Sequence, residues 1–187
     1  MGTGDGRFVL DLARANPGAF HIGIDPVAEA MADVSRRAAA KPARGGVDNA
    51  LFVQASLETL PGGLAGLADA ITVNYPWGSL LEAVVLPDEA LLTNLAGLAK
   101  PNATLDVLIN MQPLRAPDYA ARLGLADAAL TNDIAALKAV YTRAGWAVQA
   151  IEDVTGVLVR ATHWGSQLHH ARREIWRLRA VRSGGGS

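Results

Sequence analysis

The sequence predicts an α/β fold with a doubly wound, mainly parallel sheet and an antiparallel edge at the C-terminal end. Three observations carry this prediction. Apolar runs of strand length alternate with segments of helical periodicity over the first 110 residues, which favours parallel strands with helices on both faces. The glycine-rich turn GTGDG stands directly before the first helical segment. Two late strand-like runs flank a helical insert, which indicates an antiparallel edge.

Turn residues and periodicity place the elements of the first half of the chain. Pro17 and Gly18 end the first helix, and Pro26 suits the first turn of the second one. The expected elements are, in order, a helix at 7–16, a strand at 20–25, a helix at 26–41, a buried strand at 50–56 and a connector with a helical turn at 58–69.

The same signals continue through the second half. The expected elements are a strand at 70–76, helical pieces at 79–85 and 89–100, a strand at 103–111, short helices within 115–128, a helix at 131–145, a strand at 146–154, a helical segment at 161–172 and a strand at 174–181. This layout is similar to the Rossmann-like fold of class I methyltransferases, in which the ligand lies at the carboxyl ends of the strands.

Length and composition indicate one domain at 1–182. The chain has 187 residues, of which 50% are hydrophobic, but it has no run long enough to span a bilayer and no secretory signal. The absence of cysteine excludes disulfides and thiolate metal sites and suits a cytoplasmic protein. The last five residues, SGGGS at 183–187, are interpreted as a flexible linker or tag scar.

Charge is distributed unevenly along the chain. The formal net charge is −1, yet the segment from Arg160 to Arg182 holds six arginines and one acid, Glu174. A basic end on an acidic body favours an anionic macromolecular partner at one face, with a solvated charged surface as the alternative. We expect no membrane partner.

The turn GTGDG indicates a cofactor site. Gly2, Gly4 and Gly6 supply a tight turn, but the spacing is not that of a dinucleotide fingerprint, and the Lys-Ser/Thr of a P-loop is missing. Arg7 is the sole cation near the turn. A zwitterionic cofactor without phosphate groups therefore fits better than a dinucleotide.

Three acidic residues are candidates for contacts with such a cofactor. Asp25, at the end of a strand, is expected to accept hydrogen bonds from ribose hydroxyls, with a helix N-cap as the alternative role. Glu58 is placed to accept from an adenine amine, or it is a surface capping acid. Asp5 either meets an amino group of the cofactor or orients the turn.

The segment NYPWGSLL after the fourth strand-like run indicates the substrate side. A Pro-aromatic loop in this place can stack on a base taken out of its helix, so Asn74 and Trp77 are candidates, and Trp164 is a candidate for the second half of an aromatic clamp. The alternative for each tryptophan is burial in the core. The three late histidines have no acid or cysteine at ligand spacing, so we expect no metal site.

Four segments together resemble the aminoglycoside-resistance 16S rRNA methyltransferases of the kanamycin-apramycin type. They are GTGDGRFVLDLARANP, IGID, AAAKPARGG and PWGSLL, and the resemblance covers nearly the whole chain. It implies methyl transfer from S-adenosylmethionine, with S-adenosylhomocysteine as product, to N1 of the decoding-site adenine (position 1408) of 16S rRNA in the 30S subunit. It also implies aminoglycoside resistance.

The resemblance implies roles for individual residues. Trp77 and Trp164 match tryptophans that sandwich the flipped adenine, and Thr162 stands where serine is usual. The implied cofactor contacts are Gly2, Thr3, Gly4, Asp5, Asp25, Pro26, Ser56, Leu57, Glu58 and Asn74. The implied RNA contacts are Arg36, Arg37, Lys41, Arg44, Arg172 and Arg173.

The chain departs from the family pattern in two places. Gln167 and Glu174 stand at basic positions, for which Arg173 is a partial substitute. The family also has an upstream hairpin and a central strand that runs as Asp-Leu-Gly into the glycine turn, whereas Met1 stands here in place of the leucine. We therefore expect an N-terminally truncated domain whose first central strand is missing, with two exposed strand edges and poor stability alone. We expect a monomer if the strand is supplied within the same molecule.

Two further functions stay open at this point. The first is a related methyltransferase that acts on tRNA or on a small molecule. The second is a non-catalytic RNA-binding scaffold, which would bind RNA without the cofactor.

Overall fold

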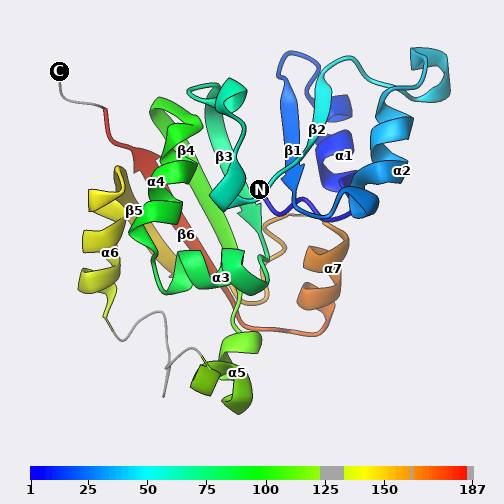
Figure 1. Ribbon diagram of the computed structural model, residues 1–187. Coiled ribbons are helices and arrows are strands. Elements are labelled where there is room, and N and C mark those ends of the chain that lie inside the picture. Colours follow the sequence, from blue (N-terminus) through cyan, green and yellow to red (C-terminus); the bar gives the residue numbers. More distant parts are fainter. Residues whose placement is uncertain (123–132, 161, 185–187) are drawn as a thin grey trace.

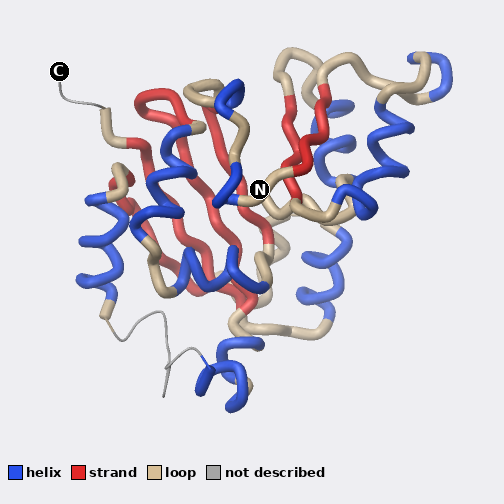
Figure 2. The backbone as a smooth tube through the Cα atoms, in the orientation of Figure 1, coloured by secondary structure: helices blue, strands red, loops and turns tan. Residues whose placement is uncertain are grey.

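The strands form two sheets flanked by helices, as Figures 1 and 2 show for the computed structural model. The structure describes residues 1–122, 133–160 and 162–184. One sheet has the order β1-β2 and the other the order β3-β4-β6-β5. Parallel ladders join β1 to β2 and β3 to β4, and antiparallel ladders join β6 to both β4 and β5. The predicted α/β class with an antiparallel C-terminal edge is confirmed.

The first 56 residues form a helix–strand–helix–strand unit. Its elements are α1 (Arg7–Ala15), β1 (His21–Asp25), α2 (Ala28–Ala38), the short 3₁₀ helix η1 (Pro42–Arg44) and β2 (Ala50–Gln54). Helix α1 buries Val9, Leu10 and Ala13 on one face, and α2 buries Met31 and Val34. These residues recur at helical spacing, which is why the two segments form amphipathic helices that cover the small sheet.

The remaining residues build the larger sheet and its helices. The elements are η2 (Leu57–Thr59), η3 (Gly62–Leu64), β3 (Ala68–Asn74), α3 (Gly78–Val85), α4 (Glu89–Gly97), β4 (Ala99–Asn110), η4 (Pro113–Arg115), α5 (Pro117–Arg122), α6 (Ile134–Arg143), β5 (Trp146–Asp153), α7 (His163–His170) and β6 (Ile175–Arg182).

The main core lies between this sheet and helices α3, α4 and α6. Leu81, Leu92, Val107 and Trp146 are fully buried there. The polar groups of its two buried aromatic residues are satisfied, because the Tyr141 hydroxyl donates to the Val84 carbonyl and the Trp146 indole N–H donates to the Leu92 carbonyl. Trp146 is therefore a core residue, which was the alternative considered for every tryptophan.

The two sheets lie side by side, and no described ladder of hydrogen bonds joins β1 to β3 (Figure 1). The first residues of the chain lie between these two strands, as the N label in Figure 1 shows. The Met1 amino group donates to the Thr72 carbonyl of β3 at 2.9 Å, and the Thr3 N–H donates to the Ile24 carbonyl of β1 at 3.2 Å. No ladder joins β1 to β3 among the described strands, and residues 1–3 bridge the two strands at one end.

Two predictions for the first half were wrong. The second helix begins at Ala28 rather than Pro26, because the Asp25 carboxylate accepts from the Val27 N–H and Val27 is extended. It ends at Ala38 rather than Lys41. Lys41 precedes Pro42, and a residue before proline disfavours helical backbone angles. The strand at 50–56 is shorter and not buried: β2 pairs with β1 alone among the described strands, and Leu51 is 45% exposed.

Some boundaries in the second half also differ. Helix α4 ends at Gly97, and β4 begins at Ala99 rather than 103 because it extends its pairing with β3 back to Ala68. Helices α6 and α7 are shorter than predicted. The predictions for residues 123–132, within the predicted short helices and the start of the next helix, lie outside the described residues.

Candidate functional site

The glycine turn adopts a backbone that other residues rarely adopt. Gly2, Gly4 and Gly6 have φ angles of 64°, 56° and 73°. A Cβ atom on Gly6 would also lie 2.7 Å from Cε1 of Phe52, which is closer than real contacts allow. Both conditions favour glycine. No heavy atom lies within 4 Å of a Cβ built on Gly4, so the turn is open on that side.

Asp25 joins the glycine turn to the end of β1. Its carboxylate is buried, with the residue 8% exposed. One oxygen accepts from the Gly4 N–H at 2.8 Å, and the other accepts from the Val27 N–H at 3.0 Å. The N-cap of α2 is Val27, so the alternative role of Asp25 as a cap is not realised. A carboxylate has about four acceptor sites, so Asp25 keeps acceptor capacity for further donors.

Asp5 orients the turn at the start of α1. The Arg7 N–H donates to the Asp5 carboxylate at 3.0 Å, and the Arg7 Nε lies 3.4 Å from the other oxygen. The charge of Arg7, the cation next to the turn, is therefore offset locally. This arrangement matches the second of the two roles considered for Asp5.

The predicted adenine side follows β2. Ser56 and Thr59 form a capping box around η2, in which their hydroxyl oxygens lie 3.1 Å apart. The Leu57 side chain is buried in the main core. Its backbone carbonyl accepts from the Asn94 side chain. Glu58 is exposed, and a hydrogen bond from Ser56 lowers the pKa of its carboxyl below the usual value. Pro26 is exposed, and its carbonyl accepts from Gln54.

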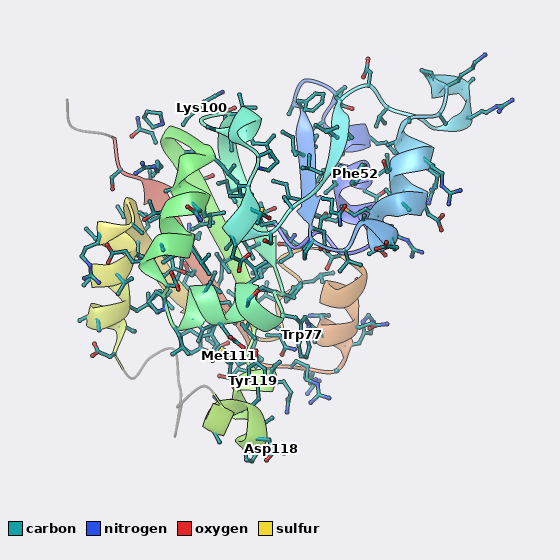
Figure 3. The ribbon with its side chains drawn as sticks, in the orientation of Figure 1. Phe52, Trp77, Lys100, Met111, Asp118 and Tyr119 are labelled. Carbon is teal, nitrogen blue, oxygen red and sulfur yellow. The ribbon has the colours of Figure 1, made fainter. Side chains whose placement is uncertain are left out.

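Trp77 lies in the loop between β3 and α3 and is 55% exposed. Figure 3 places it on the side of the molecule that carries α7. The loop begins at the buried Tyr75, which has a left-handed φ of 51°. Trp77 is therefore not a core residue, and its ring is accessible. Trp176 differs from it, because its indole N–H donates to Glu174.

Helix α7 carries the second predicted tryptophan. Thr162 is the N-cap, and its hydroxyl oxygen accepts from the Gly165 N–H at 2.8 Å. Trp164 lies in the first turn of the helix, and its side chain is outside the described residues. Thr162 thus fixes the start of the helix, a structural task that the resemblance did not specify.

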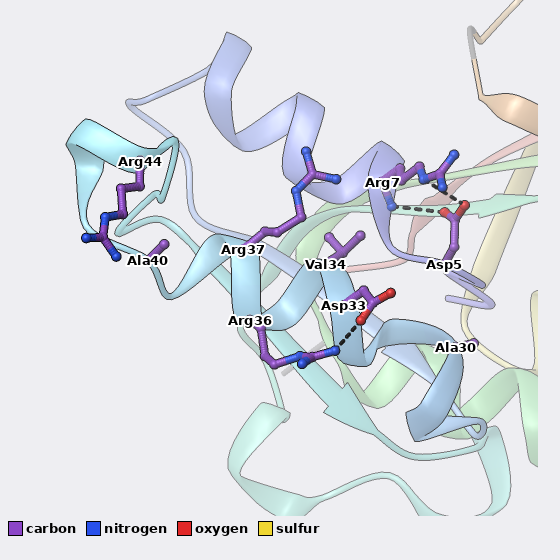
Figure 4. A pocket seen from close by; sticks show the side chains of 9 residues that line it. All are labelled: Asp5, Arg7, Ala30, Asp33, Val34, Arg36, Arg37, Ala40 and Arg44. Atoms are coloured by element: carbon purple, nitrogen blue, oxygen red, sulfur yellow. Dashed lines mark hydrogen bonds and ion pairs between the residues drawn. The ribbon is translucent and has the colours of Figure 1, made fainter.

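A pocket of about 530 Å³ lies beside α2 and contains most of the predicted docking arginines (Figure 4). Arg36 is paired with Asp33 on its own helix, whereas Arg37 points into the same pocket from the next position. The lining residues are Asp5, Arg7, Ala30, Asp33, Val34, Arg36, Arg37, Ala40 and Arg44. Lys41 is exposed between Arg37 and Arg44 in sequence. The arginines form an exposed basic surface suited to phosphate groups.

The second predicted basic segment follows α7. Arg172 is exposed and has a φ of 48°, and the Arg173 guanidinium donates to Gln112 at 2.8 Å. Glu174 makes a bidentate ion pair with Arg115, with N–O distances of 2.6 and 2.7 Å. This pairing lowers the pKa of the Glu174 carboxyl. The acid at a basic family position is therefore matched by an arginine from η4.

Arg160 was not singled out from the sequence, although its side chain connects the end of β3 to β4. Its guanidinium donates to the Asn74 side-chain oxygen at 2.8 Å and to Asp106 at 2.5 Å. Arg177 also binds Asp106. Burial by itself raises the pKa of Asp106, but the hydrogen bonds and charges of Arg177 and Arg160 outweigh it and lower the pKa. The count of arginines near the C-terminus was the one sequence signal that included Arg160.

Two further findings concern the described residues only. They contain no group of three or more histidine, aspartate or glutamate side chains placed to hold a metal ion. None of their helices combines the length and apolarity that crossing a bilayer requires.

Residues 1–182 match the family described as NpmA: 16S rRNA (adenine(1408)-N(1))-methyltransferase. The chain belongs to this family. A curated family relative from Streptoalloteichus tenebrarius, a 16S rRNA (adenine(1408)-N(1))-methyltransferase, is 33% identical over 181 residues, which cover 92% of this chain and 80% of that protein. A relative of the same name from Escherichia coli is 47% identical over 103 residues, or 55% of this chain and 47% of that protein, about half its length.

Solved structures of the family share the fold. The aminoglycoside resistance methyltransferase NpmB1 is 42% identical, with a TM-score of 0.85 over 97% of this chain and 84% of that one. A mutant 16S rRNA (adenine(1408)-N(1))-methyltransferase from Catenulisporales acidiphilia, solved with its cosubstrate SAM, is 32% identical, with a TM-score of 0.86 over 100% of this chain and 85% of that one. The predicted family is thereby confirmed, and SAM is the cosubstrate in the structure of its Catenulisporales acidiphilia member.

The residues of this chain fit the family cofactor. The buried Asp25 carboxylate keeps acceptor capacity for hydroxyl groups, and the space over Gly4 is open. The neighbouring cation, Arg7, is already paired with Asp5, so the turn is not prepared for a pyrophosphate. These features suit a nucleoside with an amino-acid end.

Proposed function

We propose that this protein transfers a methyl group from S-adenosylmethionine to N1 of adenine 1408 of 16S rRNA in the 30S subunit, and so confers aminoglycoside resistance. One observation carries the proposal. Residues 1–4 connect the buried acceptor Asp25, at the end of β1, with β3, whose carboxyl end leads into the exposed Trp77. This arrangement supports a cofactor site and a base-stacking ring at one edge of the fold.

The cofactor end of the site consists of acceptors and backbone. Asp25 would accept from the ribose hydroxyls, and the open side of the turn at Gly4 would receive the amino-acid portion. Glu58, exposed and ionised, would accept from the adenine amine. When bound, the cofactor supplies an activated methyl group on a sulfonium sulfur. Gly2, Thr3, Asp5, Pro26, Ser56, Leu57 and Asn74 complete the proposed set.

The substrate end holds the base. Trp77 would stack on one face of the flipped adenine and Trp164 on the other, and such stacking is worth about 1 to 3 kcal/mol per base. Flipping a base costs a few kcal/mol, so two stacking rings offset much of this cost. The exposure of Trp77 supports the role, because a ring that is free of the core can receive a base.

Catalysis requires alignment more than acid–base chemistry. N1 of adenine carries a lone pair in the plane of the ring, so it can attack the methyl carbon without prior loss of a proton. The task of the protein is to hold the ring edge-on to the sulfonium and to exclude water. Thr162, as the N-cap of α7, would act by holding the first turn in which Trp164 lies.

The basic surface beside α2 would bind rRNA phosphates. Arg37, Lys41 and Arg44 are exposed there, and Arg36 shares its charge with Asp33. Arg172 and Arg173 would contact the RNA near the flipped base. Phosphate contacts dominate nucleic-acid affinity, so these residues determine docking rather than base choice. We propose action in the cytoplasm, where 30S subunits are found, and as a monomer if the first central strand is supplied within the same molecule.

The test is methyl incorporation from labelled S-adenosylmethionine into purified 30S subunits, with primer extension to locate the methyl group. A stop at adenine 1408 is the expected result. Incorporation into tRNA or a small molecule would replace the proposed substrate with another methyltransferase substrate. Cofactor affinity is measured in parallel by calorimetry, and RNA binding without cofactor binding would indicate a non-catalytic scaffold.

A further inference from the structure

We propose that Arg160 is a positioning residue that holds the two tryptophan-bearing segments, the end of β3 and the start of α7, in a fixed relation. The proposal rests on the proposed function, since it concerns the two halves of the base clamp. Arg160 would act through Asn74 and through the backbone of the α7 N-terminus.

The side chain of Arg160 connects two neighbouring strands. One terminal nitrogen donates to the Asn74 side-chain oxygen at 2.8 Å, and the other donates to Asp106 of β4 at 2.5 Å. The side chains of Arg160 and Asp106 are 16% and 14% exposed, so solvent weakens this pair little. Arg177 binds both oxygens of Asp106, at 2.9 and 2.7 Å, and fixes the carboxylate in place.

The bond to Arg160 also sets the orientation of the Asn74 amide. A guanidinium has donors and no acceptor, so the amide oxygen faces Arg160 and the amide NH₂ faces away from it. Asn74 is the last residue of β3 and stands three positions before Trp77. Arg160 thus determines which polar group Asn74 presents to the site. Without Arg160 the amide could rotate and present its oxygen instead.

The backbone of Arg160 continues the connection to α7. Its carbonyl accepts from the Thr162 N–H at 2.9 Å. Gly165, in the first turn of α7, lies so close that an added Cβ would be 2.5 Å from the Arg160 carbonyl oxygen and 3.1 Å from Cε2 of Tyr75. The start of α7 therefore packs against Arg160 and Tyr75 together.

Tyr75 completes the link on the β3 side. It is buried with Leu108, Leu168 and Ile175, and its N–H donates to the Leu108 carbonyl at 2.7 Å. Its left-handed φ of 51° is costly for a residue with a side chain and persists only where the surroundings impose it. Arg160 contributes to this constraint, because it holds Asn74, the residue directly before Tyr75. The direction of the Trp77 loop is thus coupled to the start of α7.

The first test compares Arg160→Met with Arg177→Met by hydrogen exchange of the protein without substrate. Arg177 binds the same carboxylate but does not reach Asn74, so Arg177→Met is the matched control. We expect Arg160→Met to raise exchange in both 72–80 and 162–170, and Arg177→Met to leave the 162–170 segment unchanged. Unchanged exchange of 162–170 in Arg160→Met would overturn the proposal, whatever the activity.

Two further variants keep the test valid if Arg160→Met does not fold. Asn74→Leu removes the same hydrogen bond from the other side and leaves the Arg160–Asp106 pair intact, so exchange in 162–170 should again rise. Arg160→Lys keeps the charge but has no planar fork to reach both partners, so its effect should be intermediate. Normal exchange of 162–170 in Asn74→Leu would contradict the coupling.

The second test is methylation kinetics on 30S subunits. Arg160→Met is expected to lower kcat about tenfold or more, as misplacement of a positioning group does, with the KM for S-adenosylmethionine little changed. Arg160→Lys should recover part of the kcat. Equal losses in Arg160→Met and Arg177→Met would show that Arg160 only stabilises the sheet. If the unaltered chain does not methylate 30S while exchange responds as expected, the proposed function fails and the positioning role stands.

Discussion

The carboxylate of Asp25 accepts the Gly4 N–H at 2.8 Å, and this hydrogen bond joins the end of β1 to the glycine turn. It means that one side chain both shapes the turn and offers the remaining acceptors to a ligand. A substitution at Asp25 should therefore affect cofactor affinity and local order together.

Asp25→Asn is expected to weaken S-adenosylmethionine binding. The amide replaces one acceptor oxygen by a donor, which then faces either Gly4 or Val27 N–H. Loss of one hydrogen bond to a charged group costs about 1.5–3 kcal/mol, or about tenfold to a hundredfold in Kd. Calorimetry measures the change, with the exposed Asp48→Asn as control. Unaltered affinity in Asp25→Asn would remove Asp25 from the cofactor site.

Trp77→Ala should abolish methylation of 30S subunits and leave cofactor affinity nearly intact. Trp77 is 55% exposed, so its removal does not leave a core cavity. The matched control is Phe20→Ala, another exposed aromatic residue, at 61%. Trp164→Ala should behave as Trp77→Ala does. Full turnover in both tryptophan variants would contradict the base clamp.

Arg37→Glu should weaken 30S binding and reduce its dependence on salt. Each phosphate contact contributes about one unit to the slope of log K against log salt, so the slope should fall by about that amount. Arg36→Glu should have a smaller effect, because Arg36 already pairs with Asp33. Arg143→Glu, on α6, is the control for net charge. Identical binding by Arg37→Glu and the unaltered chain would exclude Arg37 from docking.

Glu174→Lys is expected to strengthen 30S binding. The change restores a basic residue beside Arg173 and releases Arg115 from its ion pair, so the local charge rises. The gain should vanish at high salt, since it is electrostatic. Glu152→Lys, which breaks the exposed pair with Arg179, is the control. A gain of the same size in that control would mean that net charge alone is responsible.

The Met1 amino group should make stability depend on pH in a polypeptide that begins at Met1. Burial lowers the pKa of this amine to about 6 from its usual 8.0. Between these values the unfolded chain binds more protons, so the free energy of unfolding rises with pH from 6 to 8, by up to about 3 kcal/mol. Denaturant titrations across this window measure it. Acetylation of Met1 should flatten the profile, and an unchanged slope after acetylation would assign it to another group.

Most of the fold could be predicted from the sequence because its helices and strands are strongly periodic. The errors have local causes that periodicity does not contain. Pro26 suits a helix start, but the Asp25 carboxylate holds Val27 in a turn. The apolar run at β2 indicates burial, but the strand has a neighbour on one side only among the described strands, so Leu51 stays exposed.

The candidate site was predictable only in part. Motifs pointed to Asp25 and Trp77, and the structure adds their partners and exposure. They could not point to Arg160, because its role depends on two residues that are 86 and 54 positions away in the sequence. In the sequence Arg160 is counted as a surface charge. In the structure its side chain is largely buried and connects β3 to β4.

The position of β6 has a consequence for synthesis. This strand is the last of the described strands in sequence, yet it lies between β4 and β5, and β5 has β6 as its hydrogen-bonded neighbour. While residues 175–182 are still within a translating ribosome, β4 has one open edge and β5 has no ladder among the described strands. Such edges invite pairing with other chains. Nascent protein should therefore be vulnerable to aggregation until residues 175–182 have left the ribosome, because only then can β6 pair and Arg177 bind Asp106.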